Sequence, residues 1–288
     1  MKISIKNQYL EAVFSEIGAE LISLHSNDQD YIWNGNPEFW GKHSPILFPI
    51  VGTLKDDTYY YENKSYQLSR HGFARDKKFQ VVKHEDYKIV FSLKEDDETL
   101  QDYPFHFELQ ITYELLYNQL KVEYSVSNNS NSKMYFSIGG HPAFALQNPF
   151  EEYSLKFEGK TDLDFSLLEN NLLLAQTQKL ETNNNELQLN YKQFEKDALV
   201  FKNQNIKAIT IKEKDTDIVR INVEHFPDLG IWTKNNAPFI CIEPWFGHAD
   251  LLETNQQLVE KEGILFLEKN DTFNAFYTIE ILTLPKFE

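Results

Sequence analysis

The stretch "HFELQITYELLYNQLKVEYSVSN", residues 106–128, alternates apolar and polar side chains along two successive runs. An alternation of period two predicts β-strands that bury one face. The letters "YNQ" between the runs, residues 117–119, indicate a tight turn, so we predict a β-hairpin. The apolar positions of its buried face are Phe107, Leu109, Ile111, Tyr113, Leu115, Leu120, Val122, Tyr124 and Val126.

The same pattern recurs along the chain, with Asn, Asp, Gly and Lys between the runs. Helical patterns are limited to short stretches at 95–104 and 191–199. With well over a dozen candidate strands, we predict an all-β protein in which two large antiparallel sheets pack face to face as a β-sandwich. Further strands are expected in residues 2–7, 88–95, 207–213, 218–225 and 273–282.

The organisation predicted for the chain is a single domain over residues 1–288, a length at which β-sandwiches often form one unit. The sequence contains no linker rich in Pro or Ser and no internal repeat at solenoid or propeller spacing. The polar run "ETNNNELQLN", residues 181–190, has the length of a surface loop.

Charge and cysteine content narrow the classes of partner and compartment. The net charge of −16 disfavours a nucleic-acid partner, because phosphates would be repelled. Cys241 is the only cysteine, so an intrachain disulfide is excluded. The sequence has neither an apolar segment of signal-peptide length at its start nor a membrane-spanning run. We therefore expect a cytoplasmic protein without a membrane partner, and a homodimer is left open.

Common catalytic motifs are missing from the sequence. It has no Gly-rich phosphate loop, no Gly-x-Ser-x-Gly elbow and no His-Glu-x-x-His helix. Cys241 lies in an apolar alternation, so packing is a better interpretation than a nucleophilic role. The eight histidines show no close metal-ligand spacing, so we expect no metal and no cofactor, although distant residues could still assemble a zinc site.

Three stretches place ionisable residues within apolar sequence that is shaped by Gly or Pro. They are "SRHGFARD" with His71 and Arg75, "SIGGHPAFAL" with His141, and "FICIEPWFGHAD" with Glu243. Each histidine alone could be an ordinary turn residue. In "GGHPAF", however, the two glycines relax the backbone limits and the proline restricts the exit, which fits a strand end that presents His141 to a cleft.

Glu243 shares the face of Phe239 and Cys241 in the alternation of its strand. An inward carboxylate costs several kcal/mol unless it is paired or serves a cleft. Desolvation would raise its pKa, which suits a general base near neutral pH. A structural salt bridge to a buried arginine is the competing interpretation.

Together these stretches suggest one pocket with a base (Glu243), an acid (His141) and fixed donors (His71 and Arg75). Aromatic side chains, including Trp245, flank each stretch. A carboxylate, imidazoles, a guanidinium and aromatic rings match a carbohydrate, which presents hydroxyls at its edges and C–H groups on its faces. The expected partner is therefore a small-molecule sugar.

The sequence at this point resembles the aldose 1-epimerase family, the galactose mutarotase-like proteins, and especially their LacX-like branch. The resemblance extends over nearly the whole chain, and it depends on the order and spacing of several motifs rather than on one. The motifs are "SEIGAELISL", "HSPILFPIVG", "HGFARD", "GGHPAF", "CIEPWFG" and "FLEKNDTFNAFYTIEIL".

The resemblance implies a large β-sandwich that needs no metal or organic cofactor and binds a sugar in a cleft. It also implies that His141 is the general acid and Glu243 the general base of anomer interconversion. His71 would bind the substrate near the ring oxygen, Asp197 would bind sugar hydroxyls, and Arg75 matches an arginine that contributes to binding in relatives that act on sugar phosphates.

Two departures from the family pattern bear on specificity. The segment around His141 is shorter than in typical galactose mutarotases, so galactose specificity is not implied. The relatives that act on hexose 6-phosphates carry an arginine where this chain has Lys42 and His43 in "WGKHSPILFP". A hexose-6-phosphate 1-epimerase and a non-catalytic carbohydrate-binding protein remain alternative functions.

Overall fold

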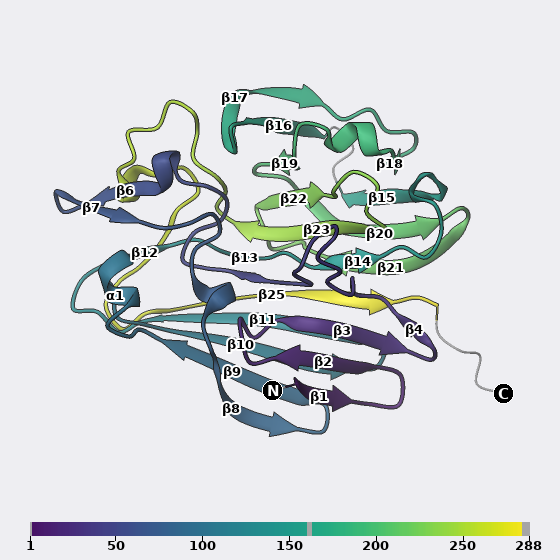
Figure 1. Ribbon diagram of the computed structural model, residues 1–288, viewed down its shortest axis with the longest axis horizontal. Helices are drawn as coiled ribbons and strands as arrows, with labels where there is room; N and C mark the ends of the chain where they lie inside the picture. The colour runs from purple at the N-terminus through teal and green to yellow at the C-terminus, as the bar shows by residue number, and fades with distance from the viewer. Residues whose placement is uncertain (1, 160–162, 284–288) are drawn as a thin grey trace.

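β-Strands dominate the computed structural model, which describes residues 2–159 and 163–283 (Figure 1). Every pair of named strands is antiparallel, so the predicted all-β class is confirmed. The short helix α1 (Thr99–Asp102) and the 3-10 turn η4 (Tyr191–Phe194) fall within the two stretches expected to be helical at most. The other 3-10 turns are η1 (Lys55–Asp57), η2 (Ala74–Asp76), η3 (Phe150–Glu152) and η5 (Leu258–Glu260).

The predicted hairpin is formed by β10 (Phe107–Leu116) and β11 (Gln119–Asn128). Leu116 pairs with Gln119, so Tyr117 and Asn118 make the turn. The nine apolar positions of the expected face are all buried, while the residues between them are more exposed. The period of two therefore identified both the strands and their buried face.

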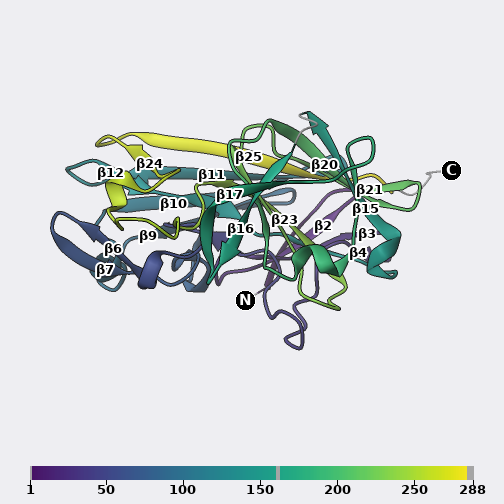
Figure 2. The same cartoon turned by 90° about the horizontal axis from the view of Figure 1, so that it is seen from above.

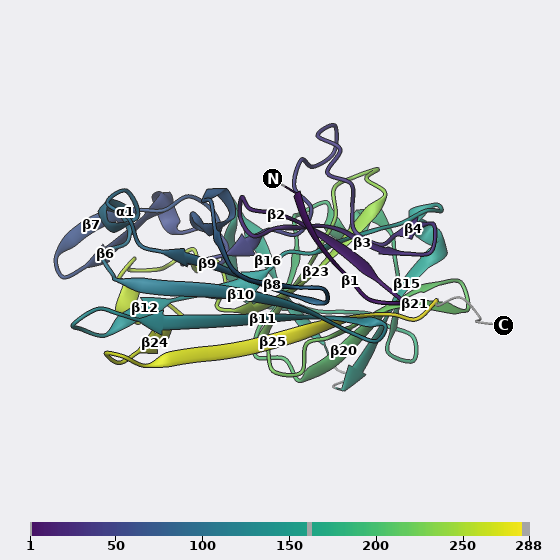
Figure 3. The same ribbon diagram turned by 90° about the horizontal axis from the view of Figure 1, so that it is seen from below.

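The hairpin lies in the larger sheet, where neighbouring strands come from distant parts of the chain. Figure 3 shows β9, β10, β11 and the last strand, β25, side by side. Among the described residues this sheet has nine strands, in the order β18 (Glu186–Gln188), β15 (Tyr153–Gly159), β20 (Ile206–Glu213), β21 (Thr216–Asn222), β25 (Thr272–Ile281), β11, β10, β9 (Lys88–Lys94) and β8 (Gln80–Glu85).

The second sheet carries two of the three stretches that attracted attention in the sequence. Its strand β23 (Phe239–Phe246) pairs with β13 (Ile138–Gly140), with β14 (Ala143–Ala145) and with β22 (Asp228–Trp232). The remaining strands described in this sheet are β17 (Leu172–Lys179), β16 (Asp164–Glu169), β19 (Leu199–Phe201) and β5 (Ile46–Leu47).

Three smaller sheets complete the described part of the chain. Figure 2 shows β6, β7, β12 and β24 toward one end of the molecule and β4, β15 and β21 toward the other. The strands are β1 (Lys2–Lys6), β2 (Glu11–Ser15), β3 (Leu21–Ser26) and β4 (Gln29–Asp30) in one sheet, β6 (Thr58–Tyr61) and β7 (Lys64–Gln67) in the second, and β12 (Met134–Phe136) and β24 (Leu265–Leu267) in the third.

The two large sheets contact each other where Gly140 of β13 faces the hydroxyls of Tyr124 on β11 and Tyr277 on β25. A Cβ on Gly140 would lie only 2.7 Å from the hydroxyl of Tyr124 and 2.9 Å from that of Tyr277, so this contact requires a glycine. Ile242 of β23 joins the same apolar core as these tyrosines. This core also includes residues of the small sheet β1–β4, which supports our proposal of a single domain. Limited proteolysis tests the proposal, since a single domain should give no stable fragments.

Strand β23 is buried on both of its faces, unlike β10 and β11. Ile240 and Ile242 face the core between the sheets, whereas Phe239 and Cys241 belong to a separate cluster with Trp33. The outer face of β23 is thus covered by loops, and Glu243 lies on that face.

None of the helices in the described ranges is long and apolar enough to cross a bilayer.

Candidate active site

The strand register brings His141 and Glu243 together. Gly139 pairs with Trp245 and Ala143 with Cys241, so His141, between the ends of β13 and β14, lies opposite Glu243 on β23. The distance between His141 Nε2 and Glu243 Oε2 is 3.2 Å, and both side chains are buried. The two stretches "GGHPAF" and "CIEPW" therefore form one site.

His71 approaches this pair from the loop after β7, and its ring centroid lies 5.6 Å from that of His141. Its φ of 70° is in the left-handed region, where a non-glycine residue costs about 1–3 kcal/mol and often marks a functional site. The loop is held by two hydrogen bonds, since His71 N–H donates to Gly52 O at 2.8 Å and Gly52 N–H donates to His71 Nδ1 at 3.1 Å.

Arg70 is a neighbour of the site that the sequence analysis did not single out. Its Nη1 donates to Asp197 Oδ2 at 3.3 Å and to Asn171 Oδ1 at 3.1 Å, and its Nε donates toward His71 Nε2 at 3.2 Å. A neutral imidazole can accept at only one ring nitrogen, so Arg70 and Gly52 N–H cannot both donate to His71 at once. One donor is therefore available for a ligand oxygen. The only sequence signal for Arg70 was its place next to His71.

Three tryptophans surround the pair. Trp40 stacks on the His141 ring at a centroid distance of 4.7 Å, and Trp232 lies at 5.7 Å in an edge-on arrangement. Trp245 lines the same cavity, and its indole occupies the space that a Cβ on Gly230 or Gly139 would fill. Trp40 and Trp232 were missed because no spacing in the sequence links them to His141.

Arg75 and Asp197 lie near the cavity but do not line it among the described residues. Arg75 Nε lies 3.5 Å from Asp76 Oδ2, and Lys42 Nζ lies 2.7 Å from Asp76 Oδ1. Asp197 contacts the site through Arg70. The lining residues are Gly52, Thr53, Arg70, His71, His141, Leu168, Asn171, Ala198, Val200, Trp232, Glu243, Trp245 and Ala249.

Burial determines the electrostatics of the catalytic candidates. It lowers the pKa of His141 to about 3, with Arg70 and Arg75 adding to the effect. Burial also lowers the pKa of His71 well below its usual range, and the neighbouring His141 contributes. For Glu243, burial raises the pKa well above its usual range, although the charge of Arg70 opposes this. Both partners of the pair are thus driven toward their uncharged forms.

Several polar atoms around the pair are not satisfied by the protein. His141 Nδ1, Glu243 Oε2 and Trp245 Nε1 are buried and have no hydrogen-bond partner within residues 2–159 and 163–283. No arginine in these ranges forms an ion pair with Glu243, so a structural Arg–Glu bridge does not account for its burial. Unpartnered buried groups that face a cavity are suited to binding a polar ligand.

The cavity over the pair is nearly filled in this arrangement, with about 20 Å³ of free volume, which is roughly the room for one water. The Arg70 side chain is 39% exposed and is held by its contacts with Asn171 and Asp197. A sugar ring does not fit entirely inside this volume, and Arg70 lies at its solvent side.

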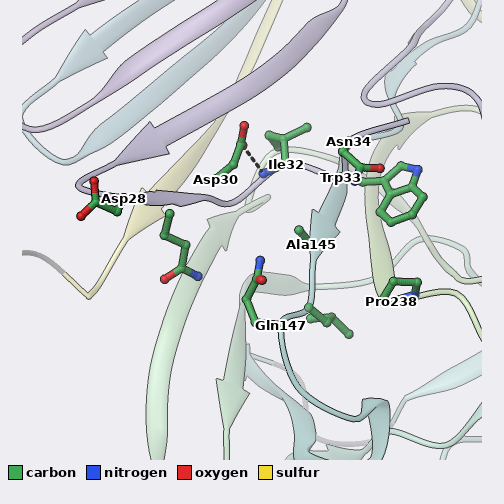
Figure 4. A pocket seen from close by; sticks show the side chains of 10 residues that line it. Asp28, Asp30, Ile32, Trp33, Asn34, Ala145, Gln147 and Pro238 are labelled. Carbon is green, nitrogen blue, oxygen red and sulfur yellow. Dashed lines mark hydrogen bonds between the residues drawn. The ribbon is translucent and has the colours of Figure 1, made fainter. Parts of the chain in front are cut away.

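A larger cavity of about 580 Å³ lies at the edge of the molecule between β4 and the segment after β14 (Figure 4). Two carboxylates line it. Asp30 already accepts hydrogen bonds from the backbone N–H groups of Leu24 and Ile32 and from the Ser23 hydroxyl, and Asp28 is exposed to solvent. Because neither carboxylate is both buried and unsatisfied, and no histidine lines the cavity among the described residues, the larger volume does not identify the reactive site.

The candidate site also has ligand atoms that could hold a metal. His141, Cys241 and Glu243 each offer one ligand atom, and these atoms lie within 4.8 Å of one another. All three side chains are buried. The scattered histidines of the sequence did not indicate this group, because the cross-strand register creates it.

These features define a β-sandwich with a buried histidine–carboxylate pair at the base of an aromatic cavity. The family model for aldose 1-epimerase matches residues 1–263, and the chain belongs to this family. It is therefore an isomerase that acts on carbohydrates, as the motifs had predicted.

Individual relatives agree with this assignment. The chain is 33% identical to the chromosomal protein LacX of Lactococcus lactis subsp. lactis, over 98% of this chain and 100% of that protein. A galactose mutarotase related enzyme from Lactobacillus acidophilus has 33% identity and a TM-score of 0.94, with 98% of each chain covered. A galactose mutarotase-like protein from Lactobacillus casei has 30% identity and a TM-score of 0.93, over 98% of this chain and 100% of that chain.

Proposed function

We propose that the protein is an aldose 1-epimerase that interconverts the α and β anomers of an unphosphorylated aldose. The observation that carries the proposal is the 3.2 Å contact between His141 Nε2 and Glu243 Oε2, which places an acid and a base side by side. Anomer exchange needs an acid and a base close to each other, because the hydroxyl that loses a proton and the ring oxygen that gains one are bonded to the same carbon.

The pair works with a single shared proton. In the reactive form Glu243 is ionised and His141 is protonated, whereas burial favours the form in which the proton lies on Glu243. The two forms differ only by transfer of this proton over 3.2 Å. The pH dependence of activity is therefore set by the two pKa values of the pair as a whole. Between these two values the pair holds one proton.

Ring opening starts when Glu243 takes the proton of the C1 hydroxyl. The bond between C1 and the ring oxygen breaks, its electron pair moves to the ring oxygen, and His141 donates a proton there. Rotation about C1–C2 presents the other face of the aldehyde. Closure then reverses both transfers, so the enzyme regains its starting protonation state.

Binding is assigned to the groups around the pair. Trp232 and Trp245 line the cavity and offer ring surfaces to C–H groups, while His71 and Arg70 line it as hydrogen-bonding groups for hydroxyls. Asp197 would reach a sugar hydroxyl from beside Arg70, its partner at 3.3 Å. Arg75 would contribute less to sugar binding, since it lies beside Asp76 and outside the lining of the cavity.

An uncharged sugar suits this site better than a hexose 6-phosphate. The cations near the cavity lie beside carboxylates, since Arg70 pairs with Asp197, while Lys42 and Arg75 share Asp76. A phosphate would have to compete with these carboxylates. Comparing anomerisation rates on glucose, galactose and glucose 6-phosphate tests this preference directly.

The central test is the rate of anomer exchange followed by polarimetry or by NMR with excess sugar. Glu243→Gln and His141→Asn should each lower kcat by about 10²- to 10⁴-fold, the usual contribution of a general base or acid. Near-normal rates in both variants would contradict the assignment. Sugar binding by calorimetry without any turnover in the unmodified protein would favour a carbohydrate-binding protein instead.

A matched control is available on the surface. His106 Nδ1 lies 3.0 Å from Glu95 Oε1, but this histidine is exposed. His106→Asn should leave the rate unchanged, which would show that the effect depends on the buried site and not on losing a histidine–carboxylate contact.

A further inference from the structure

The outer face of β23 carries a thiol next to the proposed acid–base pair. Cys241 precedes Glu243 by two residues, so both side chains point to the same side of the strand. The Cys241 sulfur, a Glu243 oxygen and a His141 nitrogen all lie within 4.8 Å of one another. Neither the family assignment nor the proposed reaction uses this thiol.

The spacing is close to that of a zinc site. Zinc–ligand bonds of about 2.0–2.3 Å in a tetrahedron put neighbouring ligand atoms roughly 3.3–3.7 Å apart. The distance between His141 Nε2 and Glu243 Oε2 is already 3.2 Å. The sulfur would need to approach by about 1 Å at most for all three atoms to share one ion.

A second observation indicates that a ligand could be accepted here. Glu243 is only 1% exposed, and its Oε2 accepts no hydrogen bond among the described residues, although His141 Nε2 lies 3.2 Å away. A thiol, an imidazole and a carboxylate oxygen this deeply buried form the ligand set of a borderline-soft cation, because thiolate and imidazole select such ions over Mg²⁺ or Ca²⁺.

We propose that His141, Cys241 and Glu243 form a binding site for a thiophilic divalent cation such as Zn²⁺. Three protein ligands leave a fourth position open toward the cavity, the arrangement found in zinc sites that are not fully enclosed. The bound ion would occupy the space in which the pair exchanges its proton.

Binding exchanges one divalent ion for two protons. The thiol loses one proton, and the His141–Glu243 pair loses the one that it shares, so the ligands become a thiolate, a carboxylate and a neutral imidazole. The buried site is then electrically neutral both before and after binding. If the proposed mutarotase function holds, the ion is an inhibitor, since neither His141 nor Glu243 can transfer a proton while it coordinates metal.

Co²⁺ is the probe of choice because its absorption spectrum reports on its ligands. After treatment with a chelator, the full-length protein should bind one equivalent of Co²⁺, with a thiolate-to-cobalt charge-transfer band and the visible bands of a four-coordinate ion. Cys241→Ala should abolish the charge-transfer band and weaken Zn²⁺ binding at least about tenfold. Absence of the band in the unmodified protein, or its persistence in Cys241→Ala, would overturn the proposal.

Further variants keep the test decisive. Glu243→Gln retains the thiol but removes one ligand, so its Zn²⁺ affinity should also fall at least about tenfold; an unchanged affinity would count against the site. His106→Asn removes the exposed His106–Glu95 pair and should leave the Co²⁺ spectrum unchanged. Loss of the charge-transfer band in this variant would overturn the proposal.

Activity measurements separate this proposal from the proposed function. One equivalent of Zn²⁺ should suppress anomer exchange in the unmodified protein, whereas the same amount of Mg²⁺ should not. If no aldose is anomerised in the absence of metal, the mutarotase assignment fails while the Co²⁺ spectrum still decides the metal site.

Discussion

Two buried pairs of ionisable residues lie on neighbouring parts of the molecule and differ in how well they are satisfied. Glu243 and His141 form one pair, and Asp250 and Lys261 form the other. The exposed fractions are similar, at 1% and 7% for the first pair and 4% and 7% for the second. Burial alone therefore does not tell the catalytic candidate from the structural pair.

Hydrogen bonding does distinguish the two pairs. Asp250 accepts from Lys261 Nζ at 2.9 Å and from the backbone N–H of Lys55 at 3.0 Å, and Lys261 Nζ also donates to His248 O at 2.6 Å. In the first pair, Glu243 Oε2 lies 3.2 Å from His141 Nε2 but accepts no hydrogen bond from the described residues. A satisfied pair holds loops together, whereas an unsatisfied one is available to a ligand.

The largest effect should come from breaking the satisfied pair. Lys261→Met leaves Asp250 buried without its cation, so we expect the free energy of unfolding to fall by about 3–5 kcal/mol. Urea denaturation measures this change. Lys214→Met removes an exposed partner of Glu152 at a similar distance of 2.8 Å and should cost no more than about 1 kcal/mol. Equal losses in the two variants would refute the distinction.

The next effect concerns pH and the unsatisfied pair. The pKa of His141 is lowered to about 3 in the folded protein, so below its unfolded pKa of about 6.5 the unfolded chain binds more protons. This histidine therefore favours unfolding increasingly as the pH falls from about 6.5 toward 3. Relative to His141→Asn, the unmodified protein should lose about 3 kcal/mol between pH 7 and pH 4.

Urea midpoints of both proteins across this pH range check the prediction. His106→Asn, at an exposed position, serves as the control and should keep the pH dependence of the unmodified protein. Parallel stability curves for the unmodified protein and His141→Asn would show that His141 is not held neutral by burial.

The smallest effect is expected for the stability of Glu243→Gln. Since burial already favours an uncharged carboxyl, an amide of the same size should change the free energy of unfolding by no more than about 1 kcal/mol. The same variant should lose most of its activity. A loss of more than about 2 kcal/mol would instead support a structural role for Glu243.

Much of the architecture could be predicted from local patterns. The alternation in residues 106–128 identified the hairpin and its buried face because a strand exposes one face per residue in strict alternation. The same rule assigned Glu243 to the face of Cys241. It could not reveal that this face is covered by loops with Trp33 and Trp40 rather than by the other large sheet.

The two glycines before His141 have a different role from the one that the local sequence suggested. We expected them to relax the backbone, yet neither has a φ in the left-handed region. Gly140 is required by the close approach of Tyr124 and Tyr277, and Gly139 by the indole of Trp245. Such steric demands come from residues far away in the sequence and leave no local signal.

The sequence by itself determined the β class, the hairpin and the family resemblance, and it singled out His141, Glu243 and His71 as candidate site residues, because all of these follow from periodicity and from motifs along the chain. Only the tertiary structure decided that His141 lies opposite Glu243, that Arg70 links His71 to Asp197, and that Cys241 joins the pair. The physical reason is that strand register and sheet packing bring together side chains that are many residues apart, and hydrogen bonds and ion binding depend on those distances alone.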